Sequence, residues 1–557
     1  MPIQDLKAWG DTMETSGIRD IIGPIMIGPS SSHTAGALRI AAMTRTLCKS
    51  APVLVTFKLY GSFAHTYVGH GTDKALVAGM LGLAADDLRI RDSFNLAQEA
   101  GMRVVFTPLA DAGHDHPNTV EITVVDADDT TMSVRGISVG GGAAIIDRID
   151  NVDVSITGKH NSIVIQNHDE KGVLAHITSC IRDFDINIAT ARMYRERKGD
   201  RAYIVLETDE AIGETLREAI SKNPAINSIR VIPAARARSA YDRSTLDKQR
   251  SPTFTSPDCA QAAFDEFDFF SGAQLLERCA KQHCSISHLF YEREIALQES
   301  HGNFADVDTY LSRVLRVMHD AATDPIKHPQ PSMGGLIGGE AKRLTELEDA
   351  GSSLCDPQLA RAITFAVAVL ETNASMGRIV AAPTAGSSGV IPAVLFSLQM
   401  THHFDDDALK AALSNAAAIG HLIARNATVS GAEGGCQAEI GAAAAMAASA
   451  ATEMAGGTPA QCLAAASNAI ANMLGLVCDP IAGLVETPCQ KRNAAGAATA
   501  LVSAQIALAG IENLVDFDQS VDTLYAVGRA LPFELRETAL GGLAATPAAC
   551  AFCASCR

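Results

Sequence analysis

Residues 161–185 read NSIVIQNHDEKGVLAHITSCIRDFD, an apolar strand-like run followed by an amphipathic one. The first eight residues predict a β-strand, and the apolar spacing of KGVLAHITSCIRDFD predicts a helix. Four further segments follow as strand, strand, helix and strand: INIATARMYRE (186–196), RAYIVLETDE (201–210), GETLREAISKN (213–223) and INSIRVIPAA (226–235). The turn residues Lys198, Gly199 and Asp200 separate the two middle strands. The order βαββαβ predicts a ferredoxin-like plait over residues 160–235.

The chain on either side of this plait has a different pattern. Residues 1–155 mix strand-like runs with Gly-rich turns and helical stretches, which predicts an α+β domain: VLVTFKLYG (53–61), MRVVFTP (102–108) and TVEITVVDAD (119–128). Residues 236–259 are rich in Arg, Ser, Thr and Pro, a composition that predicts a linker. Residues 260–557 hold Ala-rich runs of high helix propensity, which predict an all-α domain.

Composition limits the possible partners and location. The 557 residues have a net charge of −18, which argues against nucleic acid or an anionic membrane surface as a partner. The start MPIQDLKAWGD lacks the apolar core of a signal peptide, and no run of about 20 uncharged apolar residues occurs. We therefore expect a cytoplasmic protein. Its 13 cysteines should be mostly free thiols there.

Three cysteines stand at backbone breaks between helical runs. Cys436 lies in GAEGGCQAEIG (431–441), and Cys478 and Cys489 lie in GLVCDPIAGLVETPCQKRN (475–493). A helical scaffold could bring them together to hold zinc or a [4Fe–4S] cluster. Their wide spacing leaves a third alternative open, that they are unconnected core cysteines.

The C-terminal CAFCASCR holds Cys550, Cys553 and Cys556 in the spacing that starts a bacterial ferredoxin run. The fourth cysteine and the proline of that run are missing, so we expect a frayed tail. A tail with three thiols could still cap an open metal position.

The segment PSSSHT (29–34) precedes the apolar run AGALRIAAM. Its hydroxyls, its imidazole and the N–H groups of the helix start suit a substrate carboxylate. The alternative is a plain capped helix start. A hydrolase triad lacks support, because no G-x-S-x-G elbow is present.

A set of motifs in this order resembles the iron–sulfur-dependent L-serine dehydratases over nearly the whole chain: IGPSSSHTAG (27–36), GHGTDKA (69–75), HPNT (116–119), SVGGG (138–142), MGRIVAAPTAGSSGVIPA (376–393), GGCQAEIG (434–441), LGLVCDPIAGLVETPCQKRNA (474–494) and GGLAATP (541–547). The resemblance implies a β domain in residues 1–155, an ACT-like regulatory domain in 160–235 and an α domain in 260–557. In many relatives the β and α parts are separate chains.

The resemblance also implies the chemistry. Cys436, Cys478 and Cys489 would hold a [4Fe–4S] cluster with one iron free of protein thiolate, which acts as a Lewis acid on the C3 hydroxyl of L-serine. The products would be pyruvate and ammonia, in an oxygen-sensitive reaction of amino-acid degradation and gluconeogenesis. Pyridoxal phosphate is not expected, because Lys342 is the only lysine in a Gly-rich context and the phosphate cradle is not convincing.

The implied site residues come from these motifs. His33, His70 and His116 are the candidates for the proton-transferring base, which the sequence does not choose between. The predicted substrate-binding residues are Ser30, Ser31, Ser32, Thr34, Thr72, Asp73, Asn118, Thr384, Gly386, Ser387, Ser388 and Arg492. Ser387 and Ser388 can also be read as a helix N-cap pair. Some relatives have a cysteine at Ser388, so this position is no required ligand.

Three expectations remain open at this stage. Asp169 and Gly172, at the first strand-to-helix turn of the plait, are expected to form an amino-acid effector site, the alternative being a plait that only dimerises. A homodimer is expected. The substrate could instead be L-threonine or L-cysteine, or the chain could be a non-catalytic amino-acid sensor.

Overall fold

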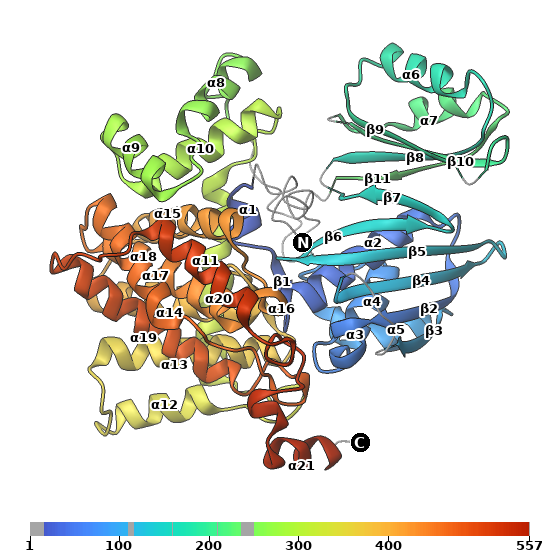
Figure 1. Cartoon of the computed structure of the whole chain (residues 1–557). Coiled ribbons are helices and arrows are strands. Elements are labelled where there is room, and N and C mark those ends of the chain that lie inside the picture. The colour runs from blue at the N-terminus through green and yellow to red at the C-terminus, as the bar shows by residue number, and fades with distance from the viewer. Residues whose placement is uncertain are drawn as a thin grey trace. The chain divides into compact units, whose positions relative to one another are not determined.

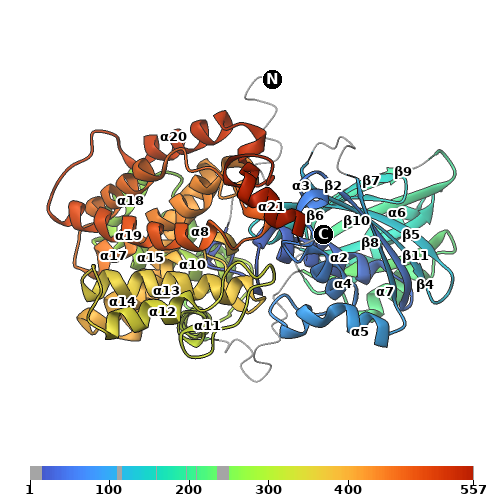
Figure 2. The ribbon, with the colours of Figure 1, turned by 90° about the horizontal axis from the view of Figure 1, so that it is seen from below.

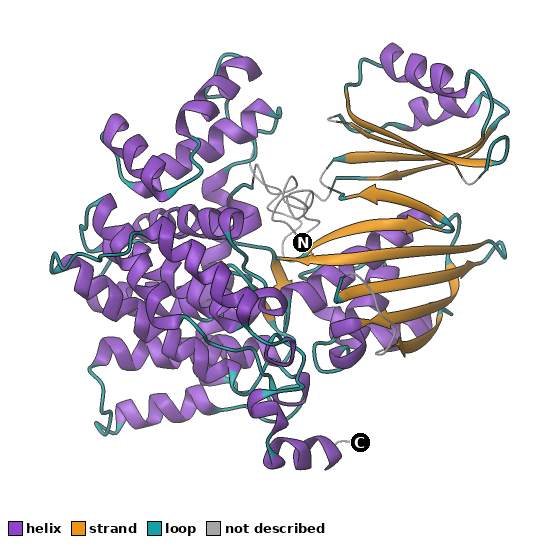
Figure 3. Ribbon diagram, viewed as in Figure 1, coloured by secondary structure: helices purple, strands orange, loops and turns teal. Residues whose placement is uncertain are grey.

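The computed structural model describes residues 16–109, 116–158, 160–195, 197–208, 210–234 and 250–555. The chain folds into two compact units. One contains residues 1–31 and 241–557, and the other contains residues 32–240. The first is mainly helical, and the second is built on two sheets (Figure 3).

A six-stranded sheet with the order β3-β2-β4-β5-β6-β7 forms the first part of the second unit (Figure 1). Only β2 and β3 are parallel, and the other neighbours are antiparallel. The strands are β2 (Pro52–Tyr60), β3 (Arg103–Leu109), β4 (Asn118–Asp126), β5 (Thr131–Gly140), β6 (Ala143–Ile149) and β7 (Val152–Ile156). Strands β2, β3 and β4 confirm the three strands expected from the sequence.

Helices cover one face of this sheet (Figure 2). Helix α2 (Ala37–Leu47) packs against β4, β5 and β6, and α4 (Thr72–Met80) packs against α2. The close approach needs Gly79, because a Cβ there would lie 2.4 Å from the carbonyl oxygen of Leu38. The shorter helices α3 (Gly61–Thr66) and α5 (Ser93–Glu99) complete this part.

The second sheet belongs to the plait, whose predicted element order is confirmed. The elements are β8 (Asn161–His168), α6 (Val173–Asp183), β9 (Ile188–Arg195), β10 (Arg201–Thr208), α7 (Glu214–Ser221) and β11 (Ile226–Ile232). The strand order is β11-β8-β10-β9, all antiparallel. Its core is aliphatic and includes Ile163, Ile177, Ile204 and Leu216.

Polar contacts join the plait to the six-stranded part of the same unit. The Tyr203 hydroxyl donates to Oδ2 of Asp150 over 2.9 Å. Nε of Arg230 donates to the carbonyl oxygen of Leu47 over 3.2 Å. The plait is therefore fixed to the sheet domain by β10 and by β11.

The helical unit follows the prediction for residues 260–557, with one exception. Strand β12 (Arg378–Val380) pairs antiparallel with β1 (Ile25–Ile27), with Met26 opposite Ile379. The domain is therefore not purely helical, and residues 16–31 group with it rather than with the sheets. Its helices are α1 (Ile18–Ile21), α8 (Pro257–Phe267), α9 (Gly272–Gln282), α10 (Ile286–Ser300), α11 (Val307–Lys327), α12 (Glu340–Asp349), α13 (Pro357–Ala374), α14 (Val390–His402), α15 (Asp406–Asn426), α16 (Gly431–Gly434), α17 (Ala442–Met454), α18 (Pro459–Met473), α19 (Cys489–Leu508), α20 (Phe517–Ala530) and α21 (Pro547–Ser555). Among the described residues, none of the helices combines the length and apolarity needed to cross a membrane.

A buried polar network fixes the N-terminal segment to α10 and α15. Ser16 Oγ and Nδ1 of His421 are 2.7 Å apart, and NH1 of Arg293 donates to the Ser16 carbonyl oxygen over 3.1 Å. The N–H of Ile18 donates to Oε2 of Glu294 over 2.8 Å. These contacts hold the segment that leads into β1.

The network makes the stability of the protein sensitive to acid. Burial, helped by the charges of Arg293 and Arg425, lowers the pKa of His421 to about 3. The unfolded chain, with an ordinary histidine pKa of about 6.5, binds this proton first, so stability is lost as the pH falls below 6.5 towards 3. At pH 5 the cost is about 2 kcal/mol.

We therefore expect His421→Gln to lose less stability than the wild type between pH 7 and pH 5, measured as the urea midpoint at each pH. His288→Gln is the control, because His288 is exposed on α10. An equal drop in all three proteins would contradict the assignment.

Candidate functional site

The three motif cysteines come together in the helical unit. Cys436 directly precedes a π-helix (Gln437–Gly441), Cys478 lies in the loop after α18, and Cys489 is the first residue of α19. All three are buried, with exposures of 3%, 3% and 6%. The backbone of Cys478 is held by Arg536 and its neighbours, since its N–H donates to the Leu535 carbonyl oxygen over 2.8 Å.

A carboxylate lies beside the thiols. The Sγ atoms of Cys436 and Cys478 and a carboxylate oxygen of Glu439 all lie within 4.8 Å of one another. Burial raises the pKa of Glu439 to about 7, although Thr384 Oγ1 donates to its Oε1 over 2.7 Å and opposes the shift. The hydrogen bond with Cys436, burial and the charge of Cys436 raise the pKa of Cys478 well above its usual range.

Two glycines allow Glu439 to reach this position. A Cβ at Gly431 would lie 2.6 Å from Oε2 of Glu439, and a Cβ at Gly386 would lie 3.1 Å from Oε1. The carboxylate is thus packed on the backbone of the GAEGG and TAGSSG motifs at once. Glu537 is a second acid and is buried, and burial followed by the charges of Glu439 and Cys436 raises its pKa well above its usual range.

Arg492 is the cation of the site. Its NH2 lies 2.8 Å from Oδ1 of Asp479, and its NH1 donates to the Val477 carbonyl oxygen over 2.8 Å. The same NH1 lies 3.6 Å from Sγ of Cys436. Asp479 in turn accepts the N–H of Leu543 over 2.7 Å, which ties the GGLAATP segment to the site.

The TAGSSG turn lies next to these groups. Thr384 Oγ1 is 3.1 Å from Ser387 Oγ, and both are buried. Oγ of Ser388 is buried and has no hydrogen-bond partner among the described residues. The N-cap interpretation of the two serines is wrong, because Gly389 occupies the N-cap of α14 and Thr384 precedes the 3₁₀ turn that contains Ser387.

The donor set fits a thiolate-bound metal group. The three buried thiols, Glu439, Glu537 and Asp479 lie near Arg492, so ionised thiols would leave uncompensated negative charge, which a bound cationic group would neutralise. Burial and then the charge of Cys436 also raise the pKa of Cys489, so Cys478 and Cys489 both favour the protonated thiol when no such group is bound. Thiolate donors suit zinc or an iron–sulfur cluster.

The second unit carries the histidine motif. His33 lies in a π-helix (Ser31–Gly36) that continues into α2, a geometry frequent at functional sites. The motif is therefore inside the helical stretch, and the expectation of a helix start directly after it is wrong. Its Nδ1 is 2.9 Å from Ser32 Oγ and its Nε2 is 2.8 Å from Ser62 Oγ.

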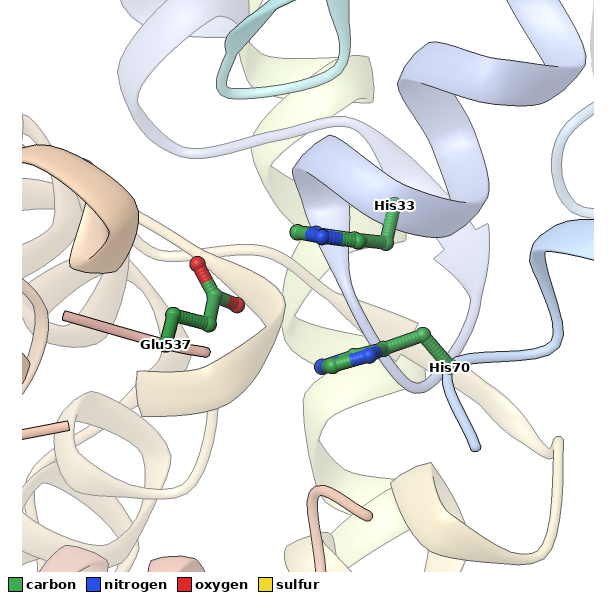
Figure 4. Close-up of side chains that lie close together, drawn as sticks. All are labelled: His33, His70 and Glu537. Carbon is green, nitrogen blue, oxygen red and sulfur yellow. The ribbon is translucent and has the colours of Figure 1, made fainter. Parts of the chain in front are cut away.

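His70 stacks on His33, with ring centroids 4.4 Å apart and planes inclined by 24° (Figure 4). Its Nδ1 lies 3.3 Å from the Thr66 carbonyl oxygen, and its own carbonyl accepts from Thr34 Oγ1 over 2.8 Å. Burial lowers the pKa of His70 to about 4. Burial and then the charge of His70 lower the pKa of His33 well below 6.5. Both rings are therefore neutral at pH 7.

Other predicted residues of this unit lie at the start of α4 and beside the start of β4. Thr72 and Asp73 begin α4 just after His70, and burial raises the pKa of Asp73 to about 6. His116 is half-buried, and its Nδ1 accepts the N–H of Asn118 over 3.1 Å. Ser30 and Ser31 are buried and belong to the helical unit.

Comparison with known proteins identifies three matching stretches. The family model of the serine dehydratase beta chain matches residues 20–148, that of the ACT domain matches 161–225, and that of the serine dehydratase alpha chain matches 281–544.

Relatives match in the same order. The L-serine dehydratase alpha chain of Peptoniphilus asaccharolyticus is 46% identical over 271 residues, which cover 49% of this chain and 92% of the relative. The beta chain from that organism is 37% identical over 201 residues, which cover 36% and 90%. The L-serine dehydratase TdcG of Escherichia coli (strain K12) is 28% identical over 548 residues, which cover 93% and 97%.

The chain belongs to the L-serine dehydratase family.

This member of the L-serine dehydratase family carries the β, ACT and α domains in one polypeptide, in the order expected from its motifs. Two asparagines that the sequence interpretation missed connect those motifs. Nδ2 of Asn373 donates to the carbonyl oxygens of Pro29 and Ala385 over 3.0 and 3.1 Å. Nδ2 of Asn493 donates to the Gly386 carbonyl oxygen over 2.8 Å. Asn493 could have been found from the sequence, because it directly follows Arg492 in QKRN.

In the ACT domain of this family member, the predicted effector residues are placed at one turn. Gly172 is the N-cap of α6 with φ 90°, a conformation that favours glycine. Oδ2 of Asp169 accepts the N–H of Gly199 over 3.1 Å and lies 3.3 Å from NH1 of Arg195. Asp169 therefore stabilises the turn between β9 and β10.

The tail of this family member is helical as far as Ser555. Helix α21 spans Pro547–Ser555 and exposes Cys550. The side chain of Cys553 and all of Cys556 lie outside the described residues, so the capping hypothesis stays a prediction.

Proposed function

We propose that the chain is an L-serine dehydratase that converts L-serine to pyruvate and ammonia, with a [4Fe–4S] cluster held by Cys436, Cys478 and Cys489. The observation that carries this proposal is the meeting of motif thiols from distant segments in one buried site. Family membership over both the α-chain and the β-chain stretches supports the substrate.

Dehydration of serine breaks the Cα–H and C3–OH bonds. When bound, the cluster would supply a Lewis acid for the C3 hydroxyl at the iron that has no protein thiolate. The residues of the chain then have to bind the carboxylate and accept the α proton.

Each unit carries donors of the kind that a substrate carboxylate needs. In the helical unit, the buried Ser388 hydroxyl has no partner among the described residues, and Arg492 supplies positive charge. In the sheet unit, the remainder of the π-helix that begins at Ser31 carries the Ser32 and Thr34 hydroxyls. A substrate carboxylate needs such donors, because the protein as a whole has a net charge of −18.

We assign the proton acceptor to His70. Donation from Nδ1–H to the Thr66 carbonyl fixes the neutral tautomer, which leaves the lone pair on Nε2. The low pKa of His70 keeps this lone pair available at neutral pH. His33, stacked on it and bonded to Ser32 and Ser62, holds the ring in place. The enamine product tautomerises to an imine, which water hydrolyses to pyruvate and ammonia.

The first test is pyruvate release from L-serine by the full chain after anaerobic reconstitution with iron and sulfide. We expect turnover that is lost on exposure to air and that is faster with L-serine than with L-threonine or L-cysteine. A protein that carries the cluster but releases no pyruvate would refute the substrate. A protein that binds no iron would refute the cluster.

The remaining proposals concern the roles of the domains, an effector site, the location and the oligomeric state. We propose that residues 1–155, 160–235 and 260–557 act as β, regulatory and α domains, that Asp169 and Gly172 contact an amino-acid effector, and that a cytoplasmic homodimer is the working form. The effector would compete with the contacts that Asp169 makes to Gly199 and Arg195.

A further inference from the structure

A cavity of about 450 Å³ lies where the plait meets the end of α2, away from the residues of the proposed reaction. It is lined by α7, the start of β11 and Lys49, which follows α2. Neither Asp169 nor Gly172 is among its lining residues. Its volume falls in the range of small-molecule sites, roughly 300–1,000 Å³.

The charge of this cavity is opposite to that of the chain. Four basic residues line it, Lys49, Arg217, Lys222 and Arg230, against two acids, Glu214 and Glu218. One of the acids is engaged, because Oε2 of Glu214 lies 2.5 Å from NH1 of Arg217. The whole protein has a net charge of −18, so its average composition does not account for the excess of basic residues in this cavity.

Two guanidinium groups line the cavity, those of Arg217 and Arg230. Nε of Arg217 is buried and has no hydrogen-bond partner among the described residues. Arg230 is held by the carbonyl oxygens of Leu47 and Ile229, which are neutral acceptors. Burial and then the charge of Arg217 lower the pKa of Arg230, so the two side chains repel one another across the cavity. An anion between them would remove this repulsion.

We propose that this cavity binds a small anion with two or more negative charges, on phosphate or carboxylate groups, through Arg217, Arg230, Lys49 and Lys222. Ser221 and Asn227 lie in the same lining and provide neutral donors. Because Arg230 also fixes the plait to Leu47, the bound anion would strengthen the junction between the ACT domain and the sheet domain.

The test is isothermal titration of the full chain with pyrophosphate and with citrate at matched ionic strength, with chloride as the blank. Arg217→Gln removes one guanidinium and is expected to weaken binding at least about tenfold. The control is Arg182→Gln on α6 of the same plait, which also removes an arginine paired with a neighbouring acid and should leave binding unchanged. Lys222→Gln is a second variant, in case Arg217→Gln does not fold.

Tighter binding of pyrophosphate would assign a phosphorylated ligand, and tighter binding of citrate a polycarboxylate; each supports the site. Absence of binding at millimolar concentrations, or equal loss in the Arg182 control, would overturn it. The measurement needs neither iron nor turnover, so its result is independent of the proposed reaction.

Discussion

Cys478→Ala is expected to lose both bound iron and pyruvate formation, the latter by more than about a hundredfold. Loss of a residue that only orients a metal ligand costs about 10–100-fold, so loss of a ligand should cost more. The reason is local: Cys478 and Cys436 are neighbours in the buried site, and the loop that carries Cys478 is held in place by Leu535 through its own backbone.

The matched control is Cys462→Ala. Cys462 is fully buried in α18 of the same helical unit, so its replacement also removes a core thiol. We expect normal iron content and near-normal turnover in that variant. If Cys478→Ala kept its iron, the three thiols would be core cysteines and the cluster proposal would fail.

His70→Asn is expected to reduce turnover by about 10²–10⁴-fold while iron binding is retained, as for the loss of a general base. The asparagine amide can still donate to the Thr66 carbonyl, but it has no basic lone pair in place of Nε2. Because the pKa of His70 is about 4, turnover of the wild type limited by this group should persist well below pH 6.5 and fall only towards pH 4.

The control for this variant is His65→Asn. His65 is exposed on α3, in the same segment of chain. Turnover and iron content are measured for both proteins from pH 5 to pH 8. Full turnover in His70→Asn would transfer the role of base to His33 or His116, and lost iron would show that the substitution disturbs more than proton transfer.

The sequence predicts the plait better than the sheet before it. Alternating residues and turn signals locate all six plait elements, because each is local. Strands β5, β6 and β7 were not separated, since SVGGG reads as a Gly-rich turn although it spans the end of β5. The pairing of β1 with β12 joins residues more than 350 positions apart, and no local pattern encodes it.

In the candidate site, too, some residues can be predicted from the sequence and others cannot. Cys436, Cys478 and Arg492 lie close together. The sequence does not single out Glu439 or Glu537, because an acid beside the thiols cannot be told from a solvated one until the fold is known. The only signal for Glu439 was the glycines at Gly386 and Gly431, which become informative once their missing Cβ atoms are seen to make room for its carboxylate.

Strand β1 has a topological consequence. Because residues 16–31 belong to the helical unit, residues 32–240 form an insertion, with both of their ends covalently attached to one body. A nick between the plait and α8 would therefore leave two fragments that share a folded unit, joined by the β1–β12 pair and the Ser16 network. The family models of the serine dehydratase beta chain and alpha chain match residues 20–148 and 281–544, on either side of this position.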